Sequence, residues 1–213
     1  MRHDNLKEVG DWFNTQDEFA NDPKFCQKGK NKLFLIAGHN GAGTGAIGYI
    51  DEGAETMALR NAIYTAISST NASAFEGIIS DNDGDRLSKV VSHINDSCSP
   101  YDLCIDIHFN AFNGKAQGTE VIIPKRATAI EQELSEIILL KTCAVLGTKN
   151  RGVKSESMSQ YSRLAMLSGL RCNSVLLEVC FCDNDSDAEK YRANKETLIT
   201  ELAKSIVAYA RSL

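Results

Sequence analysis

Strand and helix patterns alternate along most of this 213-residue chain, and that alternation limits the folds available to it. Short apolar runs predict buried strands, at residues 32–37, 75–79, 103–107, 119–123 and 174–177. Amphipathic patterns predict helices between and after them, at residues 54–69, 85–96, 130–146 and 196–211. We therefore expect an α/β fold: a single domain with a twisted, mostly parallel or mixed sheet and helices on both faces.

Finer local features follow from the same patterns. Asp85 is placed to be the N-cap of the second helix, and Gly147 the C-cap of the third. The buried stripe of the second helix should consist of Leu87, Val90, Val91 and Ile94. Residues 150–168 have no clear pattern apart from a possible short strand at 164–167.

The chain divides into a short N-terminal arm and one body. Residues 1–31 are polar and charged, with scattered aromatic residues that we expect to pack on the body; a lid or regulatory arm is the alternative. No Pro-, Gly- or Ser-rich tract divides residues 32–213, so we expect them to form one domain.

Charge and hydropathy exclude several classes of protein. The formal net charge of −5 argues against a nucleic-acid partner, because proteins that bind nucleic acids usually have a basic surface. No apolar run approaches the ~18 residues that an integral membrane segment needs, and the N-terminus lacks the apolar stretch of a signal peptide. We therefore expect synthesis in the cytoplasm. The seven cysteines lie mostly in apolar segments, which favours free thiols over disulfides.

Polar residues follow three of the predicted strands. His39 comes shortly after the first, and His108 and Glu178 come directly after two others. Since ligands gather beyond the carboxyl ends of strands in α/β sheets, these side chains are candidates for one shared site. Two imidazoles and a carboxylate are also a ligand set of catalytic zinc. Glu52 and Glu55 are alternative candidates for the carboxylate ligand. Glu55 could instead interact favourably with the positive end of the helix dipole, at the N-terminus of the first predicted helix.

Glu178 interrupts an otherwise apolar strand. A buried carboxylate is costly unless it is paired, so Glu178 should have either a functional partner or a salt bridge to an arginine. The period of two along a strand predicts that Cys180 and Cys182 share its face, where we expect them to contribute to packing.

A glycine-rich segment at residues 43–48 formally matches the GxGxxG dinucleotide fingerprint. The glycines do not directly end a strand and open a helix, as that fingerprint requires, so a nucleotide-binding enzyme is the weaker hypothesis. The segment is better explained as a mobile loop near a site, with glycines that allow positive φ.

Four blocks in order resemble a known family. They are LIAGHNGAGTGAIGYIDEGAET, LCIDIHFNAFNGKAQGTEV, NRGVK at residues 150–154, and SVLLEVCFCDN. From residue 33 to about 213 the chain resembles the zinc-dependent N-acetylmuramoyl-L-alanine amidases of the type 3 family, especially the catalytic domains of phage lysins. It departs from many members in having Ile36-Ala37 where they have Asp-Pro, and it has no recognisable wall-binding repeat.

The resemblance implies roles for specific residues. One zinc ion would be held by His39, Glu52 and His108, with Glu178 as the catalytic glutamate. Substrate contacts would come from Asn110 and Arg151.

The resemblance also implies a substrate and a setting. Zinc-activated water would cleave the amide between N-acetylmuramic acid and L-alanine in peptidoglycan, as in bacteriolytic endolysins. A chain without a signal peptide would reach the cell wall after release or by non-classical export. A zinc peptidase acting on stem-peptide bonds and a non-catalytic wall-binding relative are the alternatives.

Overall fold

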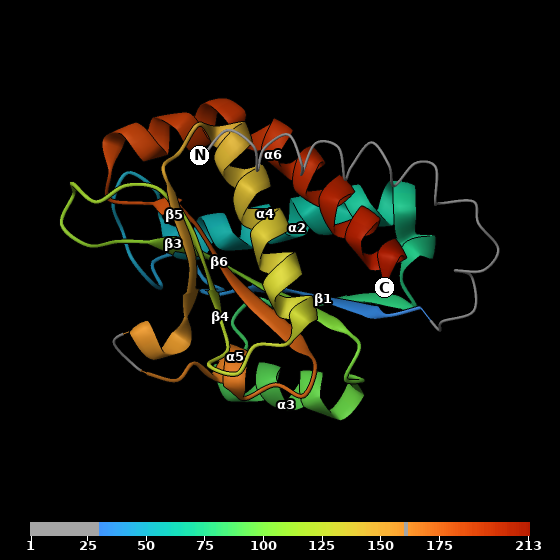
Figure 1. Cartoon of the computed structure of the whole chain (residues 1–213). Coiled ribbons are helices and arrows are strands. Elements are labelled where there is room, and N and C mark those ends of the chain that lie inside the picture. Colours follow the sequence, from blue (N-terminus) through green and yellow to red (C-terminus); the bar gives the residue numbers. More distant parts are fainter. Residues whose placement is uncertain (1–29, 160–161) are drawn as a thin grey trace.

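A six-stranded mixed sheet forms the centre of the structure, a computed structural model (Figure 1). It describes residues 30–159 and 162–213, so the arm expected at residues 1–31 lies almost entirely outside the described residues. The strands are β1 (Lys32–Ala37), β2 (Gly77–Ser80), β3 (Leu103–Asn110), β4 (Thr119–Ile123), β5 (Asn150–Ser155) and β6 (Asn173–Phe181). Their order across the sheet is β2-β1-β3-β6-β4-β5. Neighbouring strands from β2 to β6 run parallel, β4 is antiparallel to β6, and β5 is parallel to β4.

Helices cover both faces of this sheet (Figure 1). They are α2 (Glu52–Asn71), α3 (Leu87–Ser97), α4 (Ala129–Leu146), α5 (Ala165–Ser168) and α6 (Asp185–Ser212). Helices α2, α4 and α6 pack over one face, and α3 and the short α5 over the other. The predicted α/β fold is therefore confirmed. No helix in the described ranges is both long and apolar enough to cross a membrane.

The two-residue period of the strands divides the core into two layers. In β1, Leu33 and Leu35 lie in the larger cluster under α2, α4 and α6, whereas Phe34 and Ile36 lie in the smaller cluster under α3. In β3 the same alternation sends Asp106 and His108 to the α3 face, because Ile105 and Ile107 fill the larger cluster. Asp106 and His108 thus lie on the face of the sheet that α3 and α5 cover.

One β-bulge changes the faces predicted for the end of β6. His108 pairs with Glu178, but Asn110 pairs with Phe181, so β6 contains one extra residue between these pairs. Cys180 and Cys182 are consequently buried in the larger cluster. They do contribute to packing, but the prediction that they share a face with Glu178 is wrong.

Three local predictions need correction. The N-cap of α3 is Arg86, and Asp85 instead pairs with Lys89 at 2.6 Å. The stripe of α3 is narrower than predicted because Leu87 is 55% exposed. The strand expected at residues 164–167 is the short helix α5, whereas the preceding edge strand β5 lacks an apolar run that would reveal it.

The ends of the long helices were predicted unequally well. Gly147 is the C-cap of α4, with a φ of 67° in the left-handed region, as expected. Helix α6 begins at Asp185 and not at residue 196, since Asn184 caps it by accepting the backbone N–H of Asp187. Its first turns are mostly polar and show no amphipathic pattern, so the sequence does not indicate where the helix begins.

Candidate metal centre

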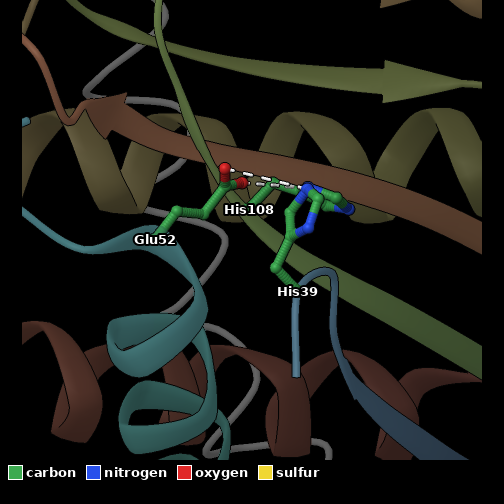
Figure 2. Close-up of side chains that lie close together, drawn as sticks. All are labelled: His39, Glu52 and His108. Atoms are coloured by element: carbon green, nitrogen blue, oxygen red, sulfur yellow. Dashed lines mark hydrogen bonds and ion pairs between the residues drawn. The ribbon is translucent and has the colours of Figure 1, made fainter. Parts of the chain in front are cut away.

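Three elements bring His39, Glu52 and His108 together (Figure 2). His39 lies in the loop after β1, Glu52 is the first residue of α2, and His108 lies on β3. One ligand atom from each side chain lies within 4.8 Å of the others. Figure 2 shows the Glu52 carboxylate pointing toward both imidazole rings.

Glu52 is buried and held from several directions. Its Oε1 accepts the backbone N–H of Phe109 at 3.1 Å, and its Oε2 accepts that of Ala46 at 2.8 Å. Burial would raise the pKa of Glu52, but the contacts with His108, Ala46 and His39 outweigh it and hold the pKa below its usual value. Glu52 therefore remains an anion that can bind a cation.

The two imidazoles approach Glu52 at an angle to each other. Nδ1 of His108 lies 3.2 Å from Oε1 of Glu52, and Nε2 of His39 lies 3.7 Å from Oε2. The ring centroids are 5.4 Å apart with an interplanar angle of 85°. Burial lowers the pKa of His108, but Asp106 and Glu52 outweigh burial and raise it well above its usual value. A bound metal would therefore have to displace a proton from this ring.

Two glycines allow this close approach. A Cβ atom on Gly45 would lie 2.5 Å from Oε2 of Glu52 and 2.7 Å from Cδ2 of His39, and its φ of +72° also favours glycine. A Cβ atom on Gly38 would lie 2.0 Å from Nε2 of His108. Within the glycine-rich segment at residues 43–48, Gly45 therefore lies directly against the side-chain cluster, a role that requires no nucleotide.

Hydrogen bonds anchor the segments that carry these residues. The Thr56 hydroxyl donates to the carbonyl oxygens of both His39 and Glu52. At the end of β1, the carboxylate of Asp81 accepts the backbone N–H of Ala37 at 3.1 Å and forms a buried ion pair with Arg60. The loop that carries His39 is thus fixed to α2 and to the end of β2.

Glu55, the competing candidate ligand, lies apart from this cluster. Its Oε1 accepts the hydroxyl of Tyr191 at 2.7 Å and forms an ion pair with Lys195. The Glu55 carboxylate therefore ties α2 to α6, and Glu52 is the carboxylate beside the two histidines.

The chemistry of the cluster fits a divalent metal ion. Two imidazoles and one ionised carboxylate are three of the ligands that a catalytic zinc uses, with a further position left for water or substrate. A cavity of about 360 Å³ lies beside His39 and His108 and extends toward α3 and α5. A metal held by this cluster would be accessible to small molecules from that cavity.

Glu178 lies on the strand next to His108 and opposite it in the register. Its Oε2 is shielded from solvent and has no hydrogen-bond partner within the described part of the chain. Burial raises the pKa of Glu178 to about 7. The charge of His108 opposes this shift, while nearby carboxylates add to it. Among residues 30–159 and 162–213, Glu178 takes part in no ion pair, so the salt bridge to an arginine is absent there.

A second carboxylate, Glu120 on β4, organises the residues around Glu178. Its Oε2 accepts hydrogen bonds from Arg151 Nε and Lys154 Nζ, both at 2.5 Å, and its Oε1 accepts one from Asn110 at 3.1 Å. The Arg151 guanidinium also lies 4.9 Å from the centroid of the Phe181 ring. Asn110 and Arg151 therefore belong to one charged network beside Glu178.

Two of the carboxylates in this region were missed in the sequence. Asp106 and Glu120 each interrupt an apolar strand, as Glu178 does, and both are buried. The cost of burying a carboxylate was a signal available for all three residues. It becomes informative only when the register shows that they share one face of the sheet.

Comparison with known proteins agrees with the fold and identifies a family. A model of the family described as N-acetylmuramoyl-L-alanine amidase matches residues 33–208. The amidase LytC of Bacillus subtilis is 30% identical over 166 residues, which cover 75% of this chain and 31% of LytC. An uncharacterized cell wall amidase of Bacillus anthracis is 34% identical over 96 residues, which cover 42% of this chain and 17% of the relative. The chain spans half or less of the length of the curated relatives it matches.

Solved structures give the same assignment. The catalytic domain of the CD27L endolysin has a TM-score of 0.66 at 25% identity, with 83% of this chain and 96% of that one covered. The amidase AmiC2 of Nostoc punctiforme has the same fold, with a TM-score of 0.68 at 17% identity and coverage of 85% and 98%. Since the family model spans nearly the whole described body, the chain belongs to the N-acetylmuramoyl-L-alanine amidase family of enzymes.

Proposed function

We propose that the protein hydrolyses the amide bond between N-acetylmuramic acid and L-alanine in peptidoglycan. One observation supports this most strongly: the cluster of His39, Glu52 and His108 lies next to a carboxylate, Glu178, that has no structural partner in the described ranges. A metal-ligand set beside a free base is an arrangement that amide hydrolysis can use. Membership of the amidase family supports the choice of substrate.

His39, Glu52 and His108 would hold one zinc ion. When bound, zinc supplies a Lewis acid that polarises the amide carbonyl and lowers the pKa of water to about 7. The backbone N–H groups of Ala46 and Phe109 orient the Glu52 carboxylate, so the proposed ligand set would be largely formed before the metal binds.

Glu178 would manage the protons of the reaction. Its carboxylate would accept a proton from the attacking water as the new C–O bond forms at the lactyl carbonyl. It would then deliver that proton to the alanine nitrogen as the C–N bond breaks, leaving a carboxylate and a free amine. A pKa of about 7 suits a group that must both accept and donate a proton near neutral pH.

Substrate recognition would come from the network beside Glu178. Asn110 and Arg151 are both bonded to Glu120, which fixes their positions on the sheet. We propose that their remaining hydrogen-bonding capacity contacts the stem peptide, with Lys154 adding positive charge. The protein would act at the cell wall, because that is where this substrate is found.

Digestion of purified peptidoglycan tests the proposed bond. Zinc-loaded protein should release new N-terminal L-alanine, measured by dansylation, without new reducing sugar ends. New amino termini on D-alanine or on a diamino acid would instead identify a peptidase acting on the stem peptide. New reducing ends would identify a glycosidase, and an unchanged wall would favour a non-catalytic wall-binding protein. The Glu178→Gln variant in the same preparation separates this activity from a contaminating hydrolase.

A further inference from the structure

Asp106 is a buried carboxylate that the proposed reaction does not use. It lies on β3 two residues before His108, on the same face of the sheet, and is 1% exposed. Its Oδ2 lies 3.2 Å from Nε2 of His108. Its Oδ1 is buried and has no hydrogen-bond partner among the described residues.

Another aspartate beside the same strand shows what a structural role looks like here. Asp102, immediately before β3, is 2% exposed. It accepts the backbone N–H of Lys32 at 2.8 Å and that of Ser99 at 2.7 Å, so it joins two segments of the chain. The Asp106 carboxylate accepts no backbone N–H in the described part of the chain, and its one hydrogen-bond contact there is His108. The one group in the described ranges that contacts this carboxylate is thus the ring of His108.

The two nitrogens of His108 face different carboxylates. Nδ1 lies 3.2 Å from Oε1 of Glu52, inside the proposed ligand set, and Nε2 faces Asp106. A neutral imidazole carries one N–H and one lone pair, and an ionised carboxylate can only accept a hydrogen bond. Glu52 and Asp106 therefore each favour an N–H on the nitrogen that they face. A metal held by Glu52 and His39 would displace the proton from Nδ1, and the N–H that remains on Nε2 is the one that Asp106 accepts.

Packing restricts the ring to this orientation. Gly38 lies against the ring so closely that a Cβ atom there would be 2.2 Å from both Cδ2 and Cε1 of His108. The backbone N–H of Gly38 also donates to the carbonyl of Ile107 at 2.8 Å, which holds the loop against β3. Asp106 and Gly38 thus fix the imidazole from two sides.

We propose that Asp106 is a positioning residue: it holds the Nε2–H tautomer of His108 and thereby presents Nδ1 to the metal. A carboxylate that accepts the second N–H of a ligand histidine fixes its tautomer and strengthens its bond to the metal, and removing such a partner typically weakens metal binding by roughly 10- to 100-fold. This inference rests on the metal centre of the proposed function, but it concerns a residue outside the ligand set.

The test compares zinc affinity in wild type, Asp106→Ala, Asp106→Asn and Asp102→Ala by competition with a chromophoric chelator. Asp106→Ala should bind zinc roughly 10- to 100-fold more weakly. Asp106→Asn should lose less, because its amide oxygen can still accept the Nε2–H. Asp102→Ala removes an equally buried carboxylate and should lower the melting temperature while leaving zinc affinity unchanged.

The tautomer itself can be observed by NMR. The chain contains four histidines, so long-range ¹H–¹⁵N spectra of histidine-labelled, zinc-loaded wild type are simple to assign. We expect His108 to carry its proton on Nε2 and to exchange it slowly, and Asp106→Ala to exchange it fast. A wild-type proton on Nδ1 would overturn the inference even if every variant at position 106 failed to fold.

The possible failures are distinguishable. If wild type binds zinc and folded Asp106→Ala binds it within about twofold of that affinity, Asp106 does not position His108, and the proposed metal centre remains. If Asp106→Ala and Asp102→Ala weaken zinc binding equally, the effect is general destabilisation and the inference is wrong. If wild type itself binds no zinc, both the metal centre and the inference fail.

Discussion

Glu178 lies directly opposite His108 across the parallel strands β3 and β6. The β-bulge that follows in β6 turns the next residues into the core, so Glu178 is the last side chain of that strand on the α3 face in regular register. This places a carboxylate without a salt-bridge partner in the described ranges beside the proposed metal ligands.

Replacing Glu178 with glutamine should separate catalysis from folding. Glutamine keeps the shape of the side chain but cannot accept the proton, so turnover should fall by at least ~10²-fold. Zinc content and melting temperature should stay close to wild type, measured by elemental analysis and thermal unfolding. Full activity in Glu178→Gln would show that another group acts as the general base and general acid.

The two neighbouring glutamates of α2 offer a matched pair for the metal. Glu52→Gln should weaken zinc binding by more than the ~10- to 100-fold expected for changes outside the ligand set, because it removes a proposed ligand. Glu55→Gln should retain zinc, since Glu55 contacts Tyr191 and Lys195 instead. Zinc bound per chain, measured after gel filtration, decides between them. Retention of zinc by Glu52→Gln would exclude Glu52 as a ligand.

Gly45 should tolerate no side chain. The Cβ atom of Gly45→Ala would collide with Glu52 and His39, so this variant should bind zinc weakly and unfold at lower temperature. Gly84→Ala is the control: Gly84 has a similar φ of +79°, but nothing lies within 4 Å of its Cβ position. Gly84→Ala should therefore show the backbone cost alone, about 1–2 kcal/mol of unfolding free energy, with normal zinc binding. Equal zinc affinity in both variants would contradict the proposed close packing around the site.

Stability should depend on pH through Glu120. Burial would raise the pKa of Glu120, but hydrogen bonds from Lys154 and Arg151 outweigh it and hold the pKa below the ordinary value of 4.5. Ionised Glu120 therefore stabilises the folded state above pH 4.5, and this contribution is lost as the pH falls through the lowered pKa.

Denaturant unfolding of wild type and Glu120→Gln from about pH 6 to about pH 3 measures this contribution, because the difference between the two proteins removes the titration of the other carboxylates. Glu120→Gln should be less stable than wild type by about 1–2 kcal/mol at pH 6, and the difference should shrink toward pH 3. Glu76→Gln is the control, since the Glu76 side chain is 63% exposed and lies 3.9 Å from Lys32. A difference for Glu120→Gln that does not change with pH would show that the charge of Glu120 is not what stabilises the network.

The sequence predicted those parts of the fold whose pattern is local. Most of the strands and helices were recognisable because apolar residues repeat with the period of each element. Strand β5 was not recognisable, because its residues are half-buried at the edge of the sheet and its sequence shows no alternation of apolar and polar side chains. The start of α6 was missed for the same reason, since its first turns are mostly charged.

The strand pattern of the sequence predicted only those site residues that directly follow a predicted strand or come shortly after one. His39, His108 and Glu178 were selected because polar residues after buried strands converge at one edge of the sheet. Asp106 and Glu120 were missed because their importance depends on the register of β3, β4 and β6, which sets them beside His108 and Glu178. The β-bulge in β6 could not be predicted either, since one extra residue does not change the apolar pattern of the strand.

Hydrolysis of a soluble glycan oligomer bearing stem peptides, carried out in ¹⁸O-labelled water, tests the proposed reaction most directly. If water attacks the lactyl carbonyl, mass spectrometry should find one ¹⁸O atom in the carboxylate of the muramyl product and none in the released peptide. The peptide should begin with an unmodified L-alanine, and Glu178→Gln should give little of either product. Label in a peptide carboxylate, with the lactyl amide intact, would contradict the proposed function and identify a peptidase.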